Sequence, residues 1–228
     1  MSRLAENLTS VKARITRAAK DAGRDPHSIK LVAVSKTKPA GDVQLAIDAG
    51  HRDFGENYLQ DALTKIEAIQ QPDIVWHFIG PIQSNKTRNI AENFHWVQTL
   101  DREKIARRLN DQRPSDLPPL NVCIQINLDD ESSKSGVCID RAMQLGQLVQ
   151  ELPSLDLRGL MFIPAPKESA DARLQTCQRA RQLFKLFQNE FPKCDTLSLG
   201  MSADLEEAVA AGSTMVRIGT DIFGTRES

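Results

Sequence analysis

From residue 30 onward, short apolar runs alternate with longer stretches in which apolar residues recur every three or four positions. Short runs rich in valine, isoleucine and leucine predict buried strands, and the longer spacing predicts amphipathic helices. Eight strand-plus-helix units are therefore expected. The predicted strands are residues 31–35, 53–55, 74–78, 96–99, 121–127, 157–163, 196–199 and 214–218, and the predicted helices are residues 41–49, 57–69, 85–93, 102–111, 139–151, 169–190 and 203–211, before a short closing segment.

An additional helix is predicted ahead of these units, over residues 2–22. Leu8, Val11 and Ile15 lie at helical spacing within it, and Gly23 marks its end. Because parallel strands need a helical crossover, this alternation favours an all-parallel sheet. Eight units in roughly 200 residues predict an α/β fold, a single (β/α)8 barrel of the TIM type that occupies residues 1–228. An open doubly wound sheet is the alternative, although no G-x-G-x-x-G motif follows the first strand.

Charge and composition argue against several classes of protein. Lys and Arg number 29 against 30 Asp and Glu, and the net charge of −1 argues against a nucleic-acid or anionic-membrane partner. No apolar run is long enough to span a bilayer, and the N-terminus carries no secretion signal. The cysteines are far apart and the histidines lack the spacing of a zinc site, so reduced thiols and no metal are expected. We expect a soluble, cytoplasmic protein.

Lys36 follows the first predicted strand and is the first candidate for chemistry. Side chains alternate along a strand, so Lys36 continues the row of Val32 and Val34 toward the rim of the core. Partial dehydration there would lower its pKa, and a neutral amine is a nucleophile toward aldehydes. Most lysines that follow a strand are simply solvated, and Lys38 occupies a similar place two residues later.

The strand ends of a parallel barrel meet at one mouth, where ligand-binding residues collect. After the seventh strand, Gly200 precedes Ser202, which is predicted to cap the next helix, and a capping serine with free N–H groups can hold a phosphate. Arg217 lies near the end of the eighth predicted strand on the same face as Met215, so it either points into the barrel or lies under the outer helices. Gly219 and Thr220 follow this strand. The other polar residues expected at the mouth include Glu56, Asn57, His77, Asn85, Asn127 and Lys134.

An amine opposite a phosphate site suits a compound that has both an aldehyde and a phosphate. Pyridoxal 5′-phosphate (PLP), which forms a Schiff base with lysine and is anchored by its phosphate, is the obvious compound. Two alternatives use the same layout: a PLP-dependent enzyme such as an amino acid racemase, and a Schiff-base aldolase that acts on a sugar phosphate without any cofactor.

Six short segments carry a resemblance to a known family. They are Val34-Ser35-Lys36-Thr37-Lys38-Pro39, Phe54-Gly55-Glu56-Asn57-Tyr58, Trp76-His77-Phe78-Ile79-Gly80, Gln83-Ser84-Asn85-Lys86, Ser198-Leu199-Gly200-Met201-Ser202 and Arg217-Ile218-Gly219-Thr220. In this order they are highly specific, and over nearly its whole length the chain resembles the YggS/PROSC family of pyridoxal phosphate homeostasis proteins. That family is similar to the N-terminal barrel domain of bacterial alanine racemases, the fold type III of PLP proteins.

The resemblance implies a role for each matched residue. Lys36 would hold PLP as an internal aldimine, and Arg217 would face the pyridine nitrogen. Ser202, Gly219 and Thr220 would bind the phosphate. The implied cofactor-binding set is Lys36, Asn57, His77, Asn85, Met201, Ser202, Arg217, Gly219 and Thr220.

Several of these residues also have a plain structural interpretation. His77 can be explained as a packed imidazole at a strand end, Met201 as packing, and Ser202 as an ordinary helix cap. Asn127 and Lys134 are expected at the mouth, and no role is assigned to them.

The resemblance also favours a carrier over an enzyme. Racemases of this fold use a second base, a tyrosine from a separate domain of the partner subunit, whereas this chain ends after the eighth unit and its only tyrosine is Tyr58. An arginine beside the pyridine nitrogen stays protonated, so the ring nitrogen should not be, and PLP becomes a poorer electron sink. We expect a monomeric, non-catalytic PLP carrier that serves vitamin B6 homeostasis and amino- and keto-acid balance, with PLP-dependent apo-enzymes as acceptors.

Overall fold

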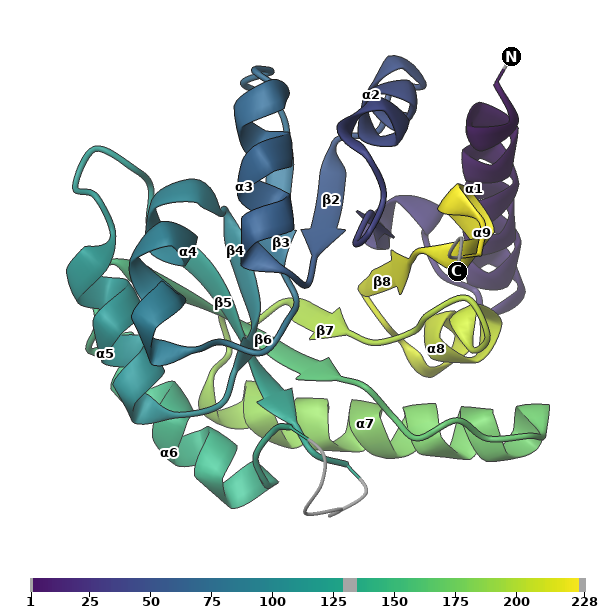
Figure 1. The fold of residues 1–228 in the computed structure, drawn as a ribbon. Helices are drawn as coiled ribbons and strands as arrows, with labels where there is room; N and C mark the ends of the chain where they lie inside the picture. Colours follow the sequence, from purple (N-terminus) through teal and green to yellow (C-terminus); the bar gives the residue numbers. More distant parts are fainter. Residues whose placement is uncertain (1, 129–134, 226–228) are drawn as a thin grey trace.

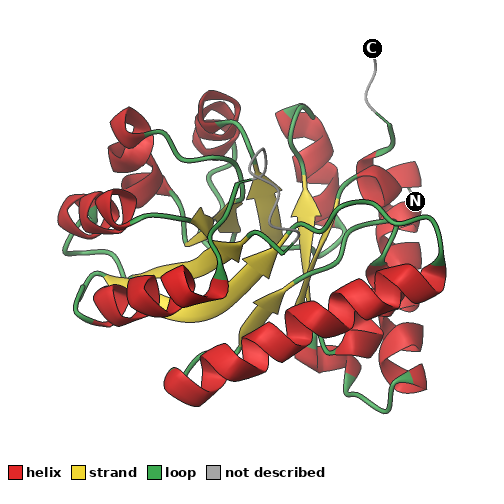
Figure 2. Ribbon diagram, turned by 90° about the horizontal axis from the view of Figure 1, so that it is seen from below, coloured by secondary structure: helices red, strands yellow, loops and turns green. Residues whose placement is uncertain are grey.

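The computed structural model describes residues 2–128 and 135–225 of the chain. Its strands are β1 (Lys30–Val34), β2 (Asp53–Glu56), β3 (Val75–Phe78), β4 (Trp96–Leu100), β5 (Leu120–Ile126), β6 (Leu155–Phe162), β7 (Thr196–Ser198) and β8 (Met215–Ile218). All neighbouring strands are parallel, and β1 pairs with β8, so the sheet closes into a barrel in chain order (Figures 1 and 2). The predicted (β/α)8 barrel is confirmed.

Helices surround the barrel on its outside (Figure 2). They are α1 (Arg3–Asp21), α2 (Ala40–Asp48), α3 (Leu59–Ala68), α4 (Thr87–Asn93), α5 (Glu103–Gln112), α6 (Ile139–Gln150), α7 (Ala170–Glu190), α8 (Leu205–Ala211) and α9 (Thr220–Phe223), with 3-10 turns at Pro26–Ser28 and Ser84–Lys86. The predicted helices are all present, and their ends differ by one or two residues from the predicted ranges. The closing segment forms the short helix α9.

Local sequence signals explain several helix ends. The Ser2 side chain accepts a hydrogen bond from the Ala5 backbone N–H at 3.3 Å, and Ser169 does the same for Ala172 at 3.2 Å. Both serines are N-caps, which satisfy N–H groups that have no partner within the helix. Gly212 ends α8 with a φ of 105°, a left-handed conformation that glycine adopts without steric cost.

The strands contribute alternate residues to two apolar clusters. One side of each strand packs against the helices, and Phe54, Leu160 and Val216 belong to this larger cluster. The other side points into the barrel, where a smaller cluster consists of Val32, Trp96, Cys123, Met161 and Met215. This alternation follows from the two-residue period of a strand, and it decides which polar residues point into the barrel.

The additional helix α1 packs beside α8 and α9, next to the last strand (Figure 1). Its Leu8, Val11 and Ile15 are buried, as their spacing predicts. The start of the chain is thereby joined to the segments that follow β7 and β8.

Two sequence expectations concern what the chain lacks. Among the residues that the structure describes, no helix combines the length and apolarity needed to cross a membrane. In the same residues no group of three or more histidine, cysteine or acidic side chains is arranged to hold a metal ion. The four cysteines are present as free thiols, and only Cys138 is exposed.

Candidate functional site

The carboxyl ends of the strands surround a cavity of about 310 Å³, which we call the carboxyl-end pocket. It includes every predicted cofactor residue except His77 and Asn85. These lining residues are Lys36, Asn57, Met201, Ser202, Arg217, Gly219 and Thr220. Active sites of (β/α)8 barrels lie at this face, because loops from every unit converge there.

Lys36 reaches the pocket because β1 ends just before it. Val34, the last residue of the strand, lines the pocket together with Lys36, and Ser35 between them is fully buried. Thr37 then has a φ of 64°, which is an unusual conformation for a β-branched residue. Such backbone strain is often found at functional sites. The ammonium of Lys38 donates to the Thr225 carbonyl at 3.0 Å, which turns Lys38 toward the segment after α9.

A buried ion pair supports Lys36 from behind the barrel wall. Lys65 of α3 donates to the Ser35 carbonyl and to Glu56 Oε1, both at 2.7 Å. The Ser35 hydroxyl donates to the same carboxylate oxygen. Burial raises the pKa of Glu56, although Lys65 and Ser35 act in the opposite direction. The sequence placed Glu56 at the mouth, but it points away from the barrel interior and fixes the backbone that precedes Lys36.

Arg217 points into the barrel and is almost fully buried, with 4% of its surface exposed. Its Nη1 donates to Ser198 Oγ at 2.6 Å, and its Nη2 donates to the Phe162 carbonyl at 2.8 Å. Burial lowers the pKa of Arg217 to about 10, and the charge of Asp204 raises it. The guanidinium therefore stays charged at neutral pH and lies between the β6, β7 and β8 strand ends.

The segments after β7 and β8 form the anion-binding side of the pocket. Gly219 is the N-cap residue of α9, and a Cβ atom there would lie only 3.2 Å from the Val34 carbonyl oxygen. Glycine thus lets this turn approach β1 closely. The prediction that Ser202 caps the next helix is wrong, because α8 begins later and Asp204 is at its N-cap position. The Asp204 carboxylate accepts from the Met201 N–H at 2.7 Å, which fixes the turn that carries Ser202.

Arg14 of α1 joins the two anion-binding segments. Its guanidinium donates to both carboxylate oxygens of Glu206 at 2.7 and 2.9 Å, and to the Ser202 carbonyl at 3.2 Å. It also forms an ion pair with Asp221, the residue after Thr220. The additional helix therefore holds the Ser202 turn and the start of α9 next to each other.

Asn57 enters the pocket from the segment after β2. Its Oδ1 atom is buried and has no hydrogen-bond partner among the described residues. Gly80 makes this position possible, since a Cβ atom there would lie 2.0 Å from the Asn57 carbonyl oxygen. A buried acceptor without a partner is costly unless a ligand donates to it.

The structure does not bring His77 and Asn85 into the pocket. His77 is fully buried inside the barrel, and its ring nitrogens lie 3.0 Å from Asp53 Oδ1 and from Gln98 Nε2. Barrel strands are staggered, and the register pairs His77 with Trp96, the first residue of β4. A residue near the end of β3 therefore lies deep in the interior. Asn85 is exposed in the 3-10 turn before α4.

Sequence reasoning missed several residues that line the pocket. Thr37, Ile163, Phe223 and Gly224 belong to it, and Ile163 is 42% exposed. Ile163 is apolar, so its residue type gave no sign of ligand binding, although its position after β6 pointed to the mouth. Asn127 does not line the pocket, and Lys134 lies outside the described residues.

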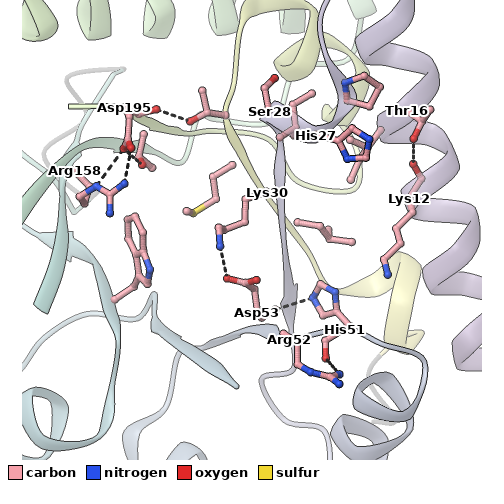
Figure 3. Close-up of a pocket in the computed structure, with 18 of the residues that line it drawn as sticks. Lys12, Thr16, His27, Ser28, Lys30, His51, Arg52, Asp53, Arg158 and Asp195 are labelled. Carbon is pink, nitrogen blue, oxygen red and sulfur yellow. Dashed lines mark hydrogen bonds and ion pairs between the residues drawn. The ribbon is translucent and has the colours of Figure 1, made fainter. Parts of the chain in front are cut away.

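A larger cavity of about 860 Å³, the amino-end cavity, lies at the opposite end of the barrel, where the strands begin. Figure 3 shows residues that line it. Its lining includes Lys30 and Asp53, which form a 2.9 Å ion pair, and Arg158, which lies 5.1 Å above the Trp96 ring. The amine of Lys30 is thus held by a carboxylate at the strand starts. Size alone does not make this cavity the cofactor site, because barrel chemistry takes place at the carboxyl ends.

The residues of the carboxyl-end pocket fit an anionic aldehyde such as PLP. Lys36, Lys38 and Arg217 bring positive charge to it, and its described lining contains no carboxylate. The start of α9 adds N–H groups without helical partners, and Asn57 adds an acceptor that lacks a partner. A bound phosphate would accept from these N–H groups, and the hydroxyl on the ring of PLP is a donor that suits Asn57 Oδ1.

Comparison with known proteins agrees with this arrangement. A family model of the alanine racemase N-terminal domain matches residues 6–227. The pyridoxal phosphate homeostasis protein of Escherichia coli is 53% identical over 230 residues, which cover 100% of this chain and 98% of that protein. The protein of the same name from Pseudomonas aeruginosa is 54% identical over 227 residues, with 100% and 97% covered.

Solved structures show the same barrel. PipY of Synechococcus elongatus, solved with PLP bound, matches with a TM-score of 0.85 and 32% identity, over 97% of this chain and 100% of that one. An alanine racemase from Corynebacterium glutamicum matches with a TM-score of 0.65 and 19% identity, over 96% of this chain and 61% of that one, a likeness of fold alone. By its sequence and its barrel, the chain belongs to the family of pyridoxal phosphate homeostasis proteins, which share the fold of the alanine racemase N-terminal domain.

Proposed function

We propose that the carboxyl-end pocket binds PLP and that this protein holds the cofactor for PLP homeostasis without catalysing a reaction of its own. One observation carries the proposal: the described lining residues include three basic side chains, one of them the strand-end lysine Lys36, and no carboxylate. The names of the relatives and the PLP bound to PipY support the same function.

Each side of the pocket has its own part in the proposal. Lys36 would hold PLP through its amine, which can bind the aldehyde of the cofactor as a Schiff base. Thr220 and Ser202 bind the phosphate through their hydroxyls, together with the N–H groups at Gly219 and the first turn of α9. Arg217 would face the pyridine nitrogen. Asn57 and Met201 complete the wall around the ring.

The proposal is tested by borohydride reduction of the PLP-loaded protein followed by peptide mass spectrometry. The reduced adduct is expected on Lys36, and Lys36→Ala should purify colourless. Lys38→Ala is the matched control and should keep the adduct, because the Lys38 ammonium is turned toward the Thr225 carbonyl. An adduct on Lys38 that persists in Lys36→Ala, after adventitious labelling of exposed lysines is excluded, would contradict the assignment.

A carrier role instead of racemisation is supported by the surroundings of Tyr58. Two-base racemisation needs an acid–base group on each side of the substrate carbon. Tyr58, the only tyrosine of the sequence, is 52% exposed and does not line the pocket. The charged Arg217 would also keep the pyridine nitrogen unprotonated, which weakens the electron withdrawal that PLP enzymes use.

The rate of alanine racemisation tests this part of the proposal. Purified, PLP-loaded protein should convert L-alanine to D-alanine far more slowly than ordinary enzymes, whose kcat values are roughly 1–10³ s⁻¹. Lys36→Ala provides the blank. Trace exchange at the α-carbon agrees with a carrier, whereas a kcat within the enzymatic range would make this a racemase.

The proposed carrier acts as a monomer in the cytoplasm and passes PLP to PLP-dependent apo-enzymes. Transfer is measured by mixing the loaded protein with an apo-enzyme and following the recovery of that enzyme's activity. Recovery that is no faster than with an equal amount of free PLP, in the presence of a trap for free PLP, would contradict direct transfer. Sedimentation of the loaded protein tests the monomer.

A further inference from the structure

A continuous chain of hydrogen bonds runs through the interior of the barrel, from the carboxyl-end pocket to the amino-end cavity. Arg217 Nη1 donates to Ser198 Oγ, and Ser198 Oγ donates to Gln98 Oε1, both at 2.6 Å. Gln98 Nε2 donates to His77 Nδ1 at 3.0 Å, and His77 Nε2 lies 3.0 Å from Asp53 Oδ1. We call Arg217, Ser198, Gln98, His77 and Asp53 the interior relay.

All bonds of the interior relay point in the same direction. Since His77 Nδ1 accepts from Gln98, the ring proton of a neutral imidazole must be on Nε2, which donates to the carboxylate of Asp53. Burial lowers the pKa of His77 and outweighs the hydrogen bond to Asp53, so the ring is neutral at neutral pH. Burial alone would raise the pKa of Asp53, but His77 and Lys30 lower it to about 2. A cation therefore stands at one end of the relay and an anion at the other.

The interior relay fills the barrel with polar side chains, whose burial costs free energy unless they are hydrogen-bonded. Ser198, Gln98 and His77 have an exposed fraction of 0%, and barrel interiors are usually filled by branched aliphatic side chains. Apolar residues of similar volume often replace buried polar networks without loss of stability. Here the network is well satisfied, because Gln98 Nε2 also contacts the Met215 sulfur at 3.2 Å. A satisfied polar network orients its members and strengthens each bond through the next.

Both ends of the interior relay reach an opening of the molecule. Arg217 lines the carboxyl-end pocket. At the other end, Asp53 lines the amino-end cavity with Lys30, and the exposed fractions of the two side chains are 17% and 41% (Figure 3). No other described charged group contacts the members between Arg217 and Asp53 through a hydrogen bond or ion pair. The relay is thus a defined connection between two surfaces that lie at opposite ends of the barrel.

We propose that Ser198, Gln98, His77 and Asp53 are positioning residues for Arg217. They hold the guanidinium at the place where the ring of the cofactor binds, and they couple that place to the Lys30–Asp53 pair in the amino-end cavity. The inference rests on the proposed function, because it takes PLP as the ligand of the carboxyl-end pocket. His77 acts here through other residues and does not touch the cofactor.

Nuclear magnetic resonance of the histidine side chains tests the relay. In ¹⁵N-histidine-labelled protein, His77 is assigned by comparison with His77→Gln. Its spectrum should show a neutral ring protonated at Nε2, and saturation with PLP should shift both ring nitrogens although His77 is outside the pocket. Ser198→Ala interrupts the relay next to Arg217, and the shift of His77 on PLP binding should disappear in this variant.

Affinity for PLP provides a second measurement. Ser198→Ala and Asp53→Asn should each weaken PLP binding by about three- to tenfold, the effect of one lost or weakened hydrogen bond on the orientation of Arg217. Met161→Leu is the matched control, because Met161 packs in the smaller interior cluster and its replacement by leucine conserves the side-chain volume. It should leave both the affinity and the shift of His77 unchanged. Asp53→Asn tests the relay at a partly exposed position, where folding is less at risk.

The outcomes separate the relay from the proposed function. If PLP binds and forms the reducible adduct on Lys36, but His77 does not respond to PLP and the Ser198 and Asp53 variants bind as tightly as the control, the relay is only structural and the inference is overturned. If the unmodified protein does not bind PLP, the proposed function fails first and the inference falls with it.

Discussion

Replacement of Lys65 by methionine is expected to lower the free energy of unfolding by more than the loss of an exposed ion pair does. Lys65 is 3% exposed, and its ammonium contacts both the Ser35 carbonyl and Glu56 Oε1 at 2.7 Å. The variant would leave the fully buried Glu56 carboxylate without its cation. Removal of one partner of a buried ion pair costs about 3–5 kcal/mol, because the remaining charge stays buried without compensation.

The second replacement isolates the charge. In the double variant Lys65→Met/Glu56→Gln no charge is left behind, so the loss should fall to about 1–2 kcal/mol, the value of the missing hydrogen bonds. Arg107→Met is the control, because its ion pair with Glu103 is about half exposed and should contribute less than about 1 kcal/mol. Urea denaturation at pH 7 measures the free energy of unfolding of each variant. For a chain of this size, 3–5 kcal/mol corresponds to a fall in Tm of about 10 °C.

The stability of these variants should depend on pH through the Glu56 carboxyl group. Burial holds the pKa of Glu56 above its ordinary value of 4.5, and loss of Lys65 should raise this pKa further. The destabilisation of Lys65→Met relative to the unmodified protein should therefore be larger at neutral pH and shrink as the pH falls toward 4.5, because the carboxyl group becomes protonated in both the folded and the unfolded chain. A loss below 1 kcal/mol at pH 7, or a double variant no more stable than Lys65→Met, would refute the reasoning.

Three further predictions follow from the same structure. Gly80→Ala should weaken PLP binding and lower the Tm, because the new Cβ atom would lie 2.0 Å from the Asn57 carbonyl oxygen; a variant with unchanged Tm and affinity would argue against this packing. Burial lowers the pKa of His51 from 6.5 to about 4, so on acidification the unfolded chain is protonated at a higher pH than the folded one, and the free energy of unfolding should fall by about 3 kcal/mol between pH 7 and pH 4. Urea titrations of His51→Gln should show a pH dependence weaker by that amount. Pyridoxal without phosphate should bind orders of magnitude more weakly than PLP, because charge-assisted hydrogen bonds contribute about 1.5–3 kcal/mol each; equal affinity in competition would remove Ser202, Gly219 and Thr220 from the phosphate site.

The sequence determined the order of elements and most of the pocket. The alternation of strand and helix periods predicted the closed parallel barrel, because each period is a local consequence of backbone geometry. The position of Lys36 followed from counting along β1, and that of Arg217 from its place near the end of the eighth predicted strand. The structure decided that Arg217 points into the barrel and not under the outer helices. Both residues lie at or just after the end of a strand, so their positions along the chain were enough to place them at the carboxyl end of the barrel.

The tertiary structure alone decided how deep each side chain lies in the barrel and which side chains it contacts. His77 has the residue type and the inward face of a site residue, yet the stagger between β3 and β4 places it in the interior beside Trp96. The stagger is a property of the closed sheet, and no single strand encodes it. In the same way, Ser198 and Gln98 are 100 residues apart in the chain and meet only because closure of the barrel brings inward-pointing side chains of β4 and β7 together. The strand periods therefore fixed which way each side chain points, whereas closure of the barrel fixed what it meets there.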